Sequence, residues 1–543
     1  MKIYFIKFKA LALAFILMIM AGCERNFLDI NVDPNNPTEV PLSQLLPYAQ
    51  LNMTNSFGFG TAGLTSVLAV YVHQTTRRAN IDDYGITGDF FGLTQPWINL
   101  YAGALTDLEV NIEQGTEQED WAYVGVAQIL KAYSFSLMVD VWGDIPYTEA
   151  LSGAEIRYPI FDRGQDIYAD LFVLLNEGIA NLAKPSNLVP RGDDLFYGGN
   201  LDRWRRLGKT IKLKMYNQVR LVPELYNAGE VATLINENDL LTGLADDFEM
   251  QYGTSVSPDS RNPAFTSEWP RGQRTYYISP YFYEILTAQS SNPVLEGIPD
   301  PRVPYYFFNQ LTDVGNAENP TEYTDPATGF LSIYFGSISP NRDFGQGDSQ
   351  TIIGLYPAGG RYDDGRGGIG AVTSNAGEVN GPGDVPQRLL THFDRLFIQA
   401  ELALMAGAPG DPRQLFESGV RGAMAKVNQV AANAGAPVIT AERIDTYVES
   451  VMELFDARGQ AGQLELILTQ KWISSFGFSV DAYTDYRRTG YPVMFDPGTD
   501  GNPLTQRTRN YPVSFPYYTN DLQINPNAPP QRVVSLDRVF WDR

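Results

Sequence analysis

The pattern of apolar and polar residues predicts that most of the chain is helical. In WAYVGVAQILKAYSFSLMVDVWG, which starts at Trp121, apolar residues recur at helical spacing and form one wide face. DRWRRLGKTIKLKMYNQVRLV has the same period, with Trp204, Leu207 and Ile211 on one side. Further helices are predicted for DIYADLFVLLNEGIANLAK, RLLTHFDRLFIQAELALMAG, DPRQLFESGVRGAMAKVNQVAANAG and QLELILTQKWISSFGFSVDAYTDY.

These periodic segments fall into two groups. The helical pattern covers about residues 42–240 and 384–490, whereas residues 241–383 and 491–543 are dense in Gly, Pro, Asn, Asp and Ser. We expect loops, short helices and a small hairpin in the first loop-rich region and loops in the second. Helix pairs of about 34 residues with Ala-rich inner faces are typical of tetratricopeptide-like hairpins. No clean consensus repeat is present, and a generic helical bundle is the alternative.

The N-terminus has the pattern of a secretory signal over residues 1–22. Residues 1–9 are basic, and residues 10–20 are apolar but too few to span a bilayer as a stable helix. The small residues Ala21 and Gly22 then precede Cys23, the only cysteine of the chain. This arrangement resembles the lipobox of bacterial lipoproteins, in which the cysteine is lipidated and becomes the new N-terminus.

Cys23 is therefore predicted to be a membrane anchor. A disulfide needs a second cysteine, and a catalytic thiol needs a positioned base. Acyl chains bury methylene groups at about 0.8 kcal/mol each, so two or three chains hold a protein on a membrane. We expect a polar tether over residues 23–41 and one domain over residues 42–543. No later apolar run reaches about 18 residues, so no transmembrane helix is predicted there.

Charge and composition narrow the classes of function. The chain has 40 Lys and Arg against 63 Asp and Glu, a net charge of −23 that repels phosphate backbones and excludes nucleic acid as a partner. Its 31 Tyr, 29 Phe and 7 Trp supply flat contact surfaces for sugars or peptides, although we expect most of them to pack in the core.

Walker, H-E-x-x-H and G-x-S-x-G motifs are missing from the sequence. His73 and His392 are interpreted as hydrogen-bonded structural residues. We expect no cofactor and leave a surface calcium ion open.

Several strings together are similar to one family. They are CERNFLDINVDPNNPTEV after the signal, MVDVWGDIPYTEAL at 138–151, DPRVPYYF at 300–307, TQKWISSFGFSVDAYTDYRRTGYP at 469–492 and the closing RVFWD. The set resembles the SusD/RagB family of outer-membrane lipoproteins of Bacteroidetes, in particular its SusD-like branch. One departure is RNYPVSFPYYTN, where Val513, Ser514 and Phe515 replace the usual acidic residue after Tyr-Pro.

The resemblance implies a mainly α fold, in which tetratricopeptide-like hairpins form a scaffold with a loop-rich face carrying few short strands. It further implies a lipid-anchored, cell-surface protein that binds oligosaccharide, delivers it to a SusC-like TonB-dependent transporter and catalyses nothing. A RagB-like member would bind oligopeptides instead. A surface glycoside hydrolase is the alternative from another class, because 63 acidic residues always include some close pair of carboxylates.

Ligand-binding residues are expected on non-helical segments that combine aromatic rings with amide, carboxylate and guanidinium groups. The resemblance implies that the segment opening an early Trp-containing helix contributes. The candidates are Arg77, Asn80, Asp82 and Asp83 in RRANIDDY, Trp97, Asn99 and Tyr101 in QPWINLY, and Trp269, Arg271, Arg274, Tyr276 and Tyr277 in SEWPRGQRTYY. Packing in the core is the alternative for Trp97, for Trp269 and for the two tyrosines.

Two further strings are given structural roles. In VWGDIPY, a glycine cap at Gly143 and the residue before Pro146 are expected to end a helix, with Trp142 and Tyr147 packing the turn. In DYRRTGYP, Arg487 and Arg488 are expected to pair bidentately with carboxylates of a neighbouring helix.

Overall fold

Helices make up most of the structured chain, which confirms the predicted mainly α fold. The computed structural model describes residues 40–78, 83–153, 155–270, 274–289, 293–368, 381–494, 496 and 510–542. The first helical group consists of α2 (Leu42–Phe57), α3 (Leu64–Tyr71), α4 (Phe91–Ile98), the π-helical segment η1 (Asn99–Leu105), α5 (Thr106–Glu117), α6 (Trp121–Trp142), α7 (Gly164–Asn181), α8 (Leu201–Gln218) and α9 (Ala228–Asn236). The second group consists of α15 (His392–Ala406), α16 (Pro412–Asn433), α17 (Ala441–Ala457), α18 (Gln460–Ser474) and α19 (Val480–Thr489).

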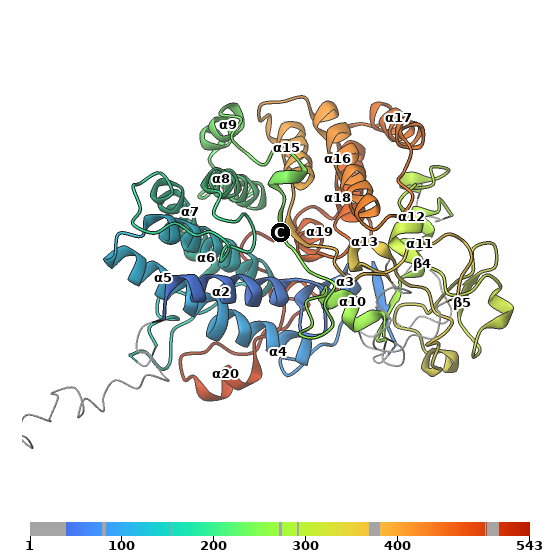
Figure 1. Ribbon diagram of the computed structural model, residues 1–543, viewed down its shortest axis with the longest axis horizontal. Helices are drawn as coiled ribbons and strands as arrows, with labels where there is room; N and C mark the ends of the chain where they lie inside the picture. The colour runs from blue at the N-terminus through green and yellow to red at the C-terminus, as the bar shows by residue number, and fades with distance from the viewer. Residues whose placement is uncertain are drawn as a thin grey trace, which may run out of the picture.

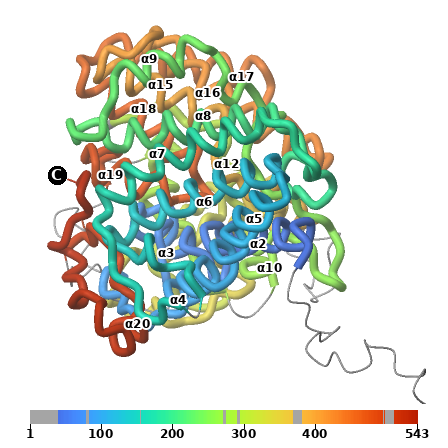
Figure 2. The backbone as a smooth tube through the Cα atoms, turned by 90° about the vertical axis from the view of Figure 1, so that its left-hand side faces the viewer, coloured from blue at the N-terminus to red at the C-terminus, as the bar shows by residue number. Residues whose placement is uncertain are grey.

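Helices that follow one another in the chain pack side by side in both groups. In the first group α5 packs on α6, α6 on α7 and α7 on α8, and in the second α15 packs on α16, α16 on α17 and α17 on α18. Helix α8 also contacts α15, so the two groups join into one scaffold (Figures 1 and 2).

Helix α6 lies at the centre of the first group. It is the one helix within the described ranges that is long and apolar enough to cross a membrane, and 94 % of its most apolar 18-residue window is buried inside the protein. The single apolar face predicted for this segment is too narrow, because every residue of α6 except Trp121 and Lys131 is buried. Because a helix that is apolar on all sides is stable in the core of a large domain, burial accounts for its composition.

The turn after α6 has the predicted structure. Gly143 adopts a φ of 86°, a conformation that side chains disfavour, and the helix ends there. Trp142 is buried and donates its indole N–H to the carbonyl of Pro516 at 3.1 Å. Tyr147 packs edge-on against Phe135, with ring centroids 4.8 Å apart.

The region between the helical groups contains short elements joined by loops. They are η2 (Leu244–Asp246), β2 (Phe248–Met250), α10 (Pro263–Glu268), β3 (Tyr276–Ile278), α11 (Pro280–Leu286), η3 (Pro293–Leu295), α12 (Val303–Tyr306), β4 (Phe307–Phe308), η4 (Val314–Asn316), β5 (Tyr323–Asp325), β6 (Phe330–Ser332), η5 (Pro340–Asp343), β7 (Ile352–Ile353), α13 (Leu355–Ala358) and β8 (Gln387–Leu390). Strands β5 and β6 form the predicted hairpin. The C-terminal region, expected to consist of loops, also contains the short helix α20 (Thr519–Ile524).

The strands pair antiparallel in twos and connect distant parts of the chain. Strand β1 (Thr75–Arg77) pairs with β3, β2 pairs with β8, and β4 pairs with β7. In the first pair Thr75 lies opposite Ile278 and Arg77 lies opposite Tyr276. The early segment of the chain is thereby fixed against the middle region.

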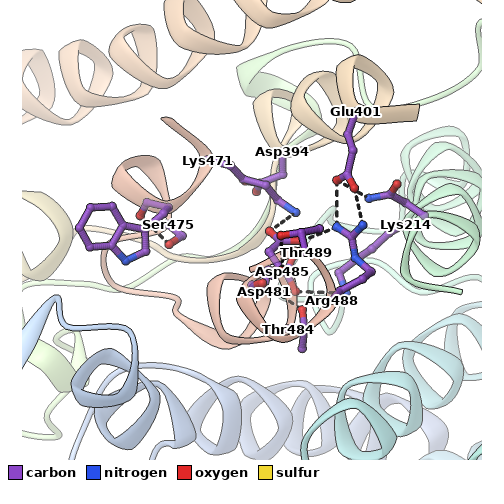
Figure 3. A network of polar contacts seen from close by, with 12 residues as sticks. Lys214, Asp394, Glu401, Lys471, Ser475, Asp481, Thr484, Asp485, Arg488 and Thr489 are labelled. Carbon is purple, nitrogen blue, oxygen red and sulfur yellow. Dashed lines mark hydrogen bonds and ion pairs between the residues drawn. The ribbon is translucent and has the colours of Figure 1, made fainter. Parts of the chain in front are cut away.

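A buried cluster of charged side chains connects α8, α15, α18 and α19 (Figure 3). Arg488 on α19 binds both carboxylate oxygens of Glu401 on α15, one of them at 2.9 Å, and Arg220 lies 3.0 Å from the same carboxylate. Lys471 lies 2.8 Å from Asp485. The bidentate pairing predicted for Arg488 is thus confirmed.

Arg487 differs from the prediction. Its guanidinium donates to the backbone carbonyls of Val513, at 2.7 Å, and Asp140, and lies 4.0 Å from the centroid of the Tyr483 ring. Consecutive residues of a helix point about 100° apart, so Arg487 cannot face the partner of Arg488 and instead turns to the C-terminal segment.

Both histidines have the structural role expected of them. His73 Nε2 lies 2.8 Å from the hydroxyl of Tyr84, and His392 Nδ1 lies 2.8 Å from Oδ1 of Asp247. Both side chains are buried.

Candidate ligand-binding cleft

Trp97 is a packed residue at the end of α4. Its side chain is 3 % exposed, and its ring centroid lies 4.9 Å from that of Tyr101 and 5.1 Å from that of Trp142. The indole N–H donates to Oδ2 of Asp521 on α20 at 2.7 Å. In the structure Trp97 is therefore a buried anchor and not an open stacking surface. This agrees with the packing alternative given for Trp97 from the sequence.

Asn99 and Tyr101 lie in the π-helical segment that follows α4. Such segments are rare and often mark functional positions. Asn99 is half-buried, and the hydroxyl of Tyr101 donates to the carbonyl of Pro146 at 2.7 Å. Burial, followed by the nearby carboxylate of Asp521, raises the pKa of Tyr101 well above its ordinary value, so the hydroxyl stays protonated as a donor.

The RRANIDDY segment is only partly described. Arg77 and Asp83 are both buried, with 3.6 Å between Arg77 Nε and Asp83 Oδ1. The guanidinium carbon of Arg77 also lies 4.7 Å from the centroid of the Phe90 ring, next to the start of α4. Asn80 and Asp82 lie outside the described residues.

Trp269 is also packed in the core. It is 1 % exposed, donates its indole N–H to the carbonyl of Ile353 at 2.9 Å and stacks on Phe265. The buried Arg274 donates to the carbonyls of Glu268, at 2.7 Å, and Trp269, at 2.9 Å, and so completes the end of α10. The side chains of Trp269 and Arg274 are both buried, so neither is open to a ligand in this structure.

The remaining candidates of this segment lie on β3, and Arg271 lies outside the described residues. Tyr277 is buried, whereas Tyr276 is half-buried and packs edge-on against Phe59. Since Tyr276 lies opposite Arg77 in the β1–β3 pair, the structure brings two of the three predicted segments together. The third, around Trp97, instead contacts the C-terminal region.

An open cleft of about 620 Å³ lies where that C-terminal region meets the loop before α4. Its lining residues come from these two parts of the chain and are Gly85, Ile86, Thr87, Gly88, Asn510, Pro516, Thr519, Leu522, Gln531, Arg532, Val533, Val534 and Ser535. Thr519 and Leu522 belong to α20, the helix whose Asp521 binds Trp97. The cleft therefore adjoins a predicted site residue, although none of the predicted site residues lines it.

Two lining residues hold the walls of the cleft in place. The side-chain amide of Gln531 accepts from the backbone N–H of Tyr517 and donates to its carbonyl, both at 2.8 Å. Arg532 donates to Oγ of Ser514 at 3.0 Å and to the carbonyl of Asp537 at 2.6 Å. The side of the cleft formed by residues 531–535 is thus pre-organised.

The lining offers polar groups that are mostly uncharged. Hydroxyls come from Thr87, Thr519 and Ser535, an amide comes from Asn510, and apolar surface comes from aliphatic side chains such as Leu522. The Gln531 amide is already engaged with the backbone of Tyr517. Arg532 is the one charged side chain among the described lining residues. Within the described ranges, no group of three His, Cys, Asp or Glu residues is arranged to hold a metal ion.

Comparison with known structures supports this description of the fold. A SusD-like protein of Bacteroidetes is 20 % identical, with a TM-score of 0.68 over 93 % of this chain and 100 % of its own. A SusD/RagB family protein from Bacteroides thetaiotaomicron is 17 % identical (TM-score 0.66; 93 % and 99 % covered), and a chitin-binding SusD homologue from Flavobacterium johnsoniae is also 17 % identical (TM-score 0.64; 92 % and 98 % covered).

The family assignment comes from the sequence itself. A search of curated proteins gives no match. Residues 34–512, most of the chain, match the model of the SusD-like family described as starch-binding and associating with the outer membrane, and the protein therefore belongs to this SusD-like family.

Proposed function

We propose that the protein is a cell-surface lipoprotein that binds a neutral oligosaccharide and delivers it to a SusC-like TonB-dependent transporter in the outer membrane. The observation that carries the proposal is the family match over residues 34–512, because the family's description names both a glycan and the outer membrane. The cleft beside α20 is the proposed binding site.

The chemistry of the cleft suits a neutral saccharide. Sugar hydroxyls need both donors and acceptors, which hydroxyl and amide side chains supply, and the C–H faces of the ring need apolar surface. A volume of about 620 Å³ lies within the usual range of small-molecule sites. The net charge of −23 disfavours polyanionic glycans.

We propose binding without turnover. Hydrolysis of a glycosidic bond by the usual mechanism requires two carboxyl groups that flank the bond. The described residues that line the cleft include neither Asp nor Glu. This argues against the glycoside hydrolase alternative for this site.

The lipid anchor belongs to the same proposal. Cys23 and most of the tether lie outside the described residues, so the support is the lipobox-like sequence before Cys23 together with the family's association with the membrane. The intact mass of the mature N-terminal peptide tests it: a diacylglyceryl-modified Cys23 is expected, and an unmodified thiol would contradict the anchor.

Calorimetric titration of residues 24–543 tests the binding function. The panel contains chito-oligosaccharides, malto-oligosaccharides and oligopeptides. The first two are chosen because one similar protein is described as chitin-binding and the family as starch-binding. The oligopeptides test the RagB-like alternative. We expect binding of a saccharide with no shortening of its chain. Binding of peptides alone would favour the alternative receptor, and shortened products would identify a hydrolase.

A matched pair of variants assigns the site. Thr87→Trp places a large ring in the cleft, whereas Val173→Trp places the same ring on the exposed surface of α7. We expect Thr87→Trp to weaken saccharide binding by about tenfold or more, the change that loss of about 1.4 kcal/mol produces, and Val173→Trp to leave it unchanged. Equal affinity of both variants would show that the ligand binds elsewhere.

A further inference from the structure

Helix α20 is a partly exposed segment that lies against a buried tryptophan. None of its six residues is buried, yet its Asp521 accepts the indole N–H of Trp97, which is 3 % exposed. Figures 1 and 2 both show α20 beside α4 at the lower edge of the molecule, away from the stacked helices of the scaffold. The segment from Tyr518 to Asn527, which we call the strap, is thus held at the surface rather than within the core.

Mainly polar contacts hold the strap in place. Asn525 donates to the carbonyl of Pro159 at 2.7 Å and Asn527 donates to that of Tyr158 at 2.6 Å, while the backbone N–H of Thr519 lies 3.4 Å from the carbonyl of Gly88. Its apolar contribution is limited to the half-buried Tyr518 and Leu522. Segments with few buried apolar contacts open locally at low free energy.

The charge of Asp521 also weakens the closed position. Burial raises the pKa of Asp521, and the hydrogen bond from Trp97 acts in the opposite direction. The described residues give this carboxylate no ion pair. A partly desolvated carboxylate without a cation lowers the stability of the arrangement that buries it.

Movement of the strap would change the cleft directly. Thr519 and Leu522 line the cleft from the same short helix that carries Asp521. The chain on either side is fixed, because Pro516 accepts from Trp142 and Gln531 binds the backbone of Tyr517. An outward movement of α20 would therefore widen the cleft and break the Trp97–Asp521 hydrogen bond in one step.

We propose that the strap is a movable wall of the cleft, latched by the hydrogen bond between Trp97 and Asp521, which opens to admit a saccharide chain and closes on it. In this device Trp97 is a positioning residue that acts through Asp521. The closing on a saccharide rests on the proposed function, whereas the opening is a property of the protein alone.

Hydrogen–deuterium exchange of the ligand-free mature protein tests the opening. Trp97→Phe removes the indole donor and keeps an aromatic ring, whereas Asp521→Asn keeps an acceptor and removes the charge. We expect amides of residues 519–525 to exchange about tenfold faster in Trp97→Phe, as for the loss of one hydrogen bond to a charged acceptor. In Asp521→Asn, by contrast, the amides of residues 519–525 should exchange more slowly than in the wild type.

Trp472→Phe is the control for general destabilisation. Trp472 is equally buried and donates its indole N–H to the carbonyl of Val72 at 2.9 Å, but it lies on α18. The strap proposal is wrong if Trp97→Phe and Trp472→Phe leave residues 519–525 with the same exchange rate, or if these amides exchange as slowly as those of α6 in the wild type.

Exchange in the presence of chito- or malto-oligosaccharide tests the closing. We expect a bound saccharide to slow exchange in residues 519–525, and Trp97→Phe to accelerate saccharide dissociation. A saccharide that binds without protecting the strap overturns the strap proposal and leaves the binding function intact. Rapid, latch-dependent opening with no saccharide bound by calorimetry supports the movable segment and overturns the saccharide function.

Discussion

The buried carboxylate of Glu401 gives a stability prediction whose size follows from its contacts. Its side chain is almost completely buried and accepts hydrogen bonds from both terminal nitrogens of Arg488, from Asn217 at 2.9 Å and from Arg220 at 3.0 Å. Glu401→Ala would leave two guanidinium groups and an amide without this acceptor. Arg488 would keep Asp485 at 3.0 Å, but Asp485 already pairs with Lys471, so the buried cluster would have an excess of positive charge. Because removal of one partner of a buried ion pair is strongly destabilising, we expect the free energy of unfolding to fall by about 3–5 kcal/mol.

An exposed pair with the same geometry is the control. Arg413 binds Asp456 through two nitrogens at 2.8 and 2.9 Å, but the two side chains are 42 % and 51 % exposed. Water compensates for the loss of such a pair, so Asp456→Ala should cost no more than about 1 kcal/mol. Urea unfolding at pH 7, followed by far-UV circular dichroism, measures both. A difference of less than about 1 kcal/mol between the two variants would refute the reasoning.

The pH dependence provides a second measurement on the same residue. Burial alone would raise the pKa of Glu401, but Arg488 and then Arg220 outweigh it, and the pKa lies well below its ordinary value. A depressed carboxyl pKa contributes stability that is present above the unfolded-state pKa of about 4.3 and is lost as the pH falls toward the folded-state pKa. The stability difference between the wild type and Glu401→Gln should therefore shrink below about pH 4.

Two further predictions concern buried rings. Trp269→Ala should lower the free energy of unfolding by about 3–5 kcal/mol, whereas Phe91→Ala, at a ring that is 54 % exposed, should change it by no more than about 0.5 kcal/mol in urea unfolding. Burial lowers the pKa of His73 from 6.5 to about 3, so stability is lost as the pH falls from 6.5 toward 3, by about 1.4 kcal/mol per pH unit. His73→Gln should remove this component, and an unchanged pH slope would contradict it.

The helical scaffold could be predicted because its signal is local. In α8 and α15 the apolar residues recur with the helical period, because one side of each helix packs against its neighbours. For α6, which is buried on nearly all sides, the signal is its length and apolar content. The same holds for the end of α6, where the helix ends at Gly143. The sequence predicts that Arg488 pairs with a carboxylate. It does not identify Glu401 as the partner, because Glu401 lies 87 positions away.

The binding site could not be predicted in the same way. A tryptophan in a short segment such as QPWINLY has the same local sequence whether its ring contacts a sugar or another part of the protein. What decides the matter for Trp97 is Asp521, which lies 424 positions further along the chain. The cleft combines residues 85–88 with residues 510–535, and neither segment contributes to its lining the aromatic side chains by which sugar sites are usually sought.

The end of α6 explains why a rigid scaffold and a movable wall can coexist in the C-terminal region. Phe515 donates its backbone N–H to the carbonyl of Val141 at 2.9 Å, and Trp541 donates its indole N–H to Oδ1 of Asp140 at 2.8 Å. Both contacts are buried, and they fix the chain to α6 before and after the strap. Residues 518–527 are then a loop with anchored ends, which can move without unfolding the core. The buried C-terminal anchors and the partly exposed strap between them thus have different stabilities for one physical reason, the amount of apolar surface that each buries.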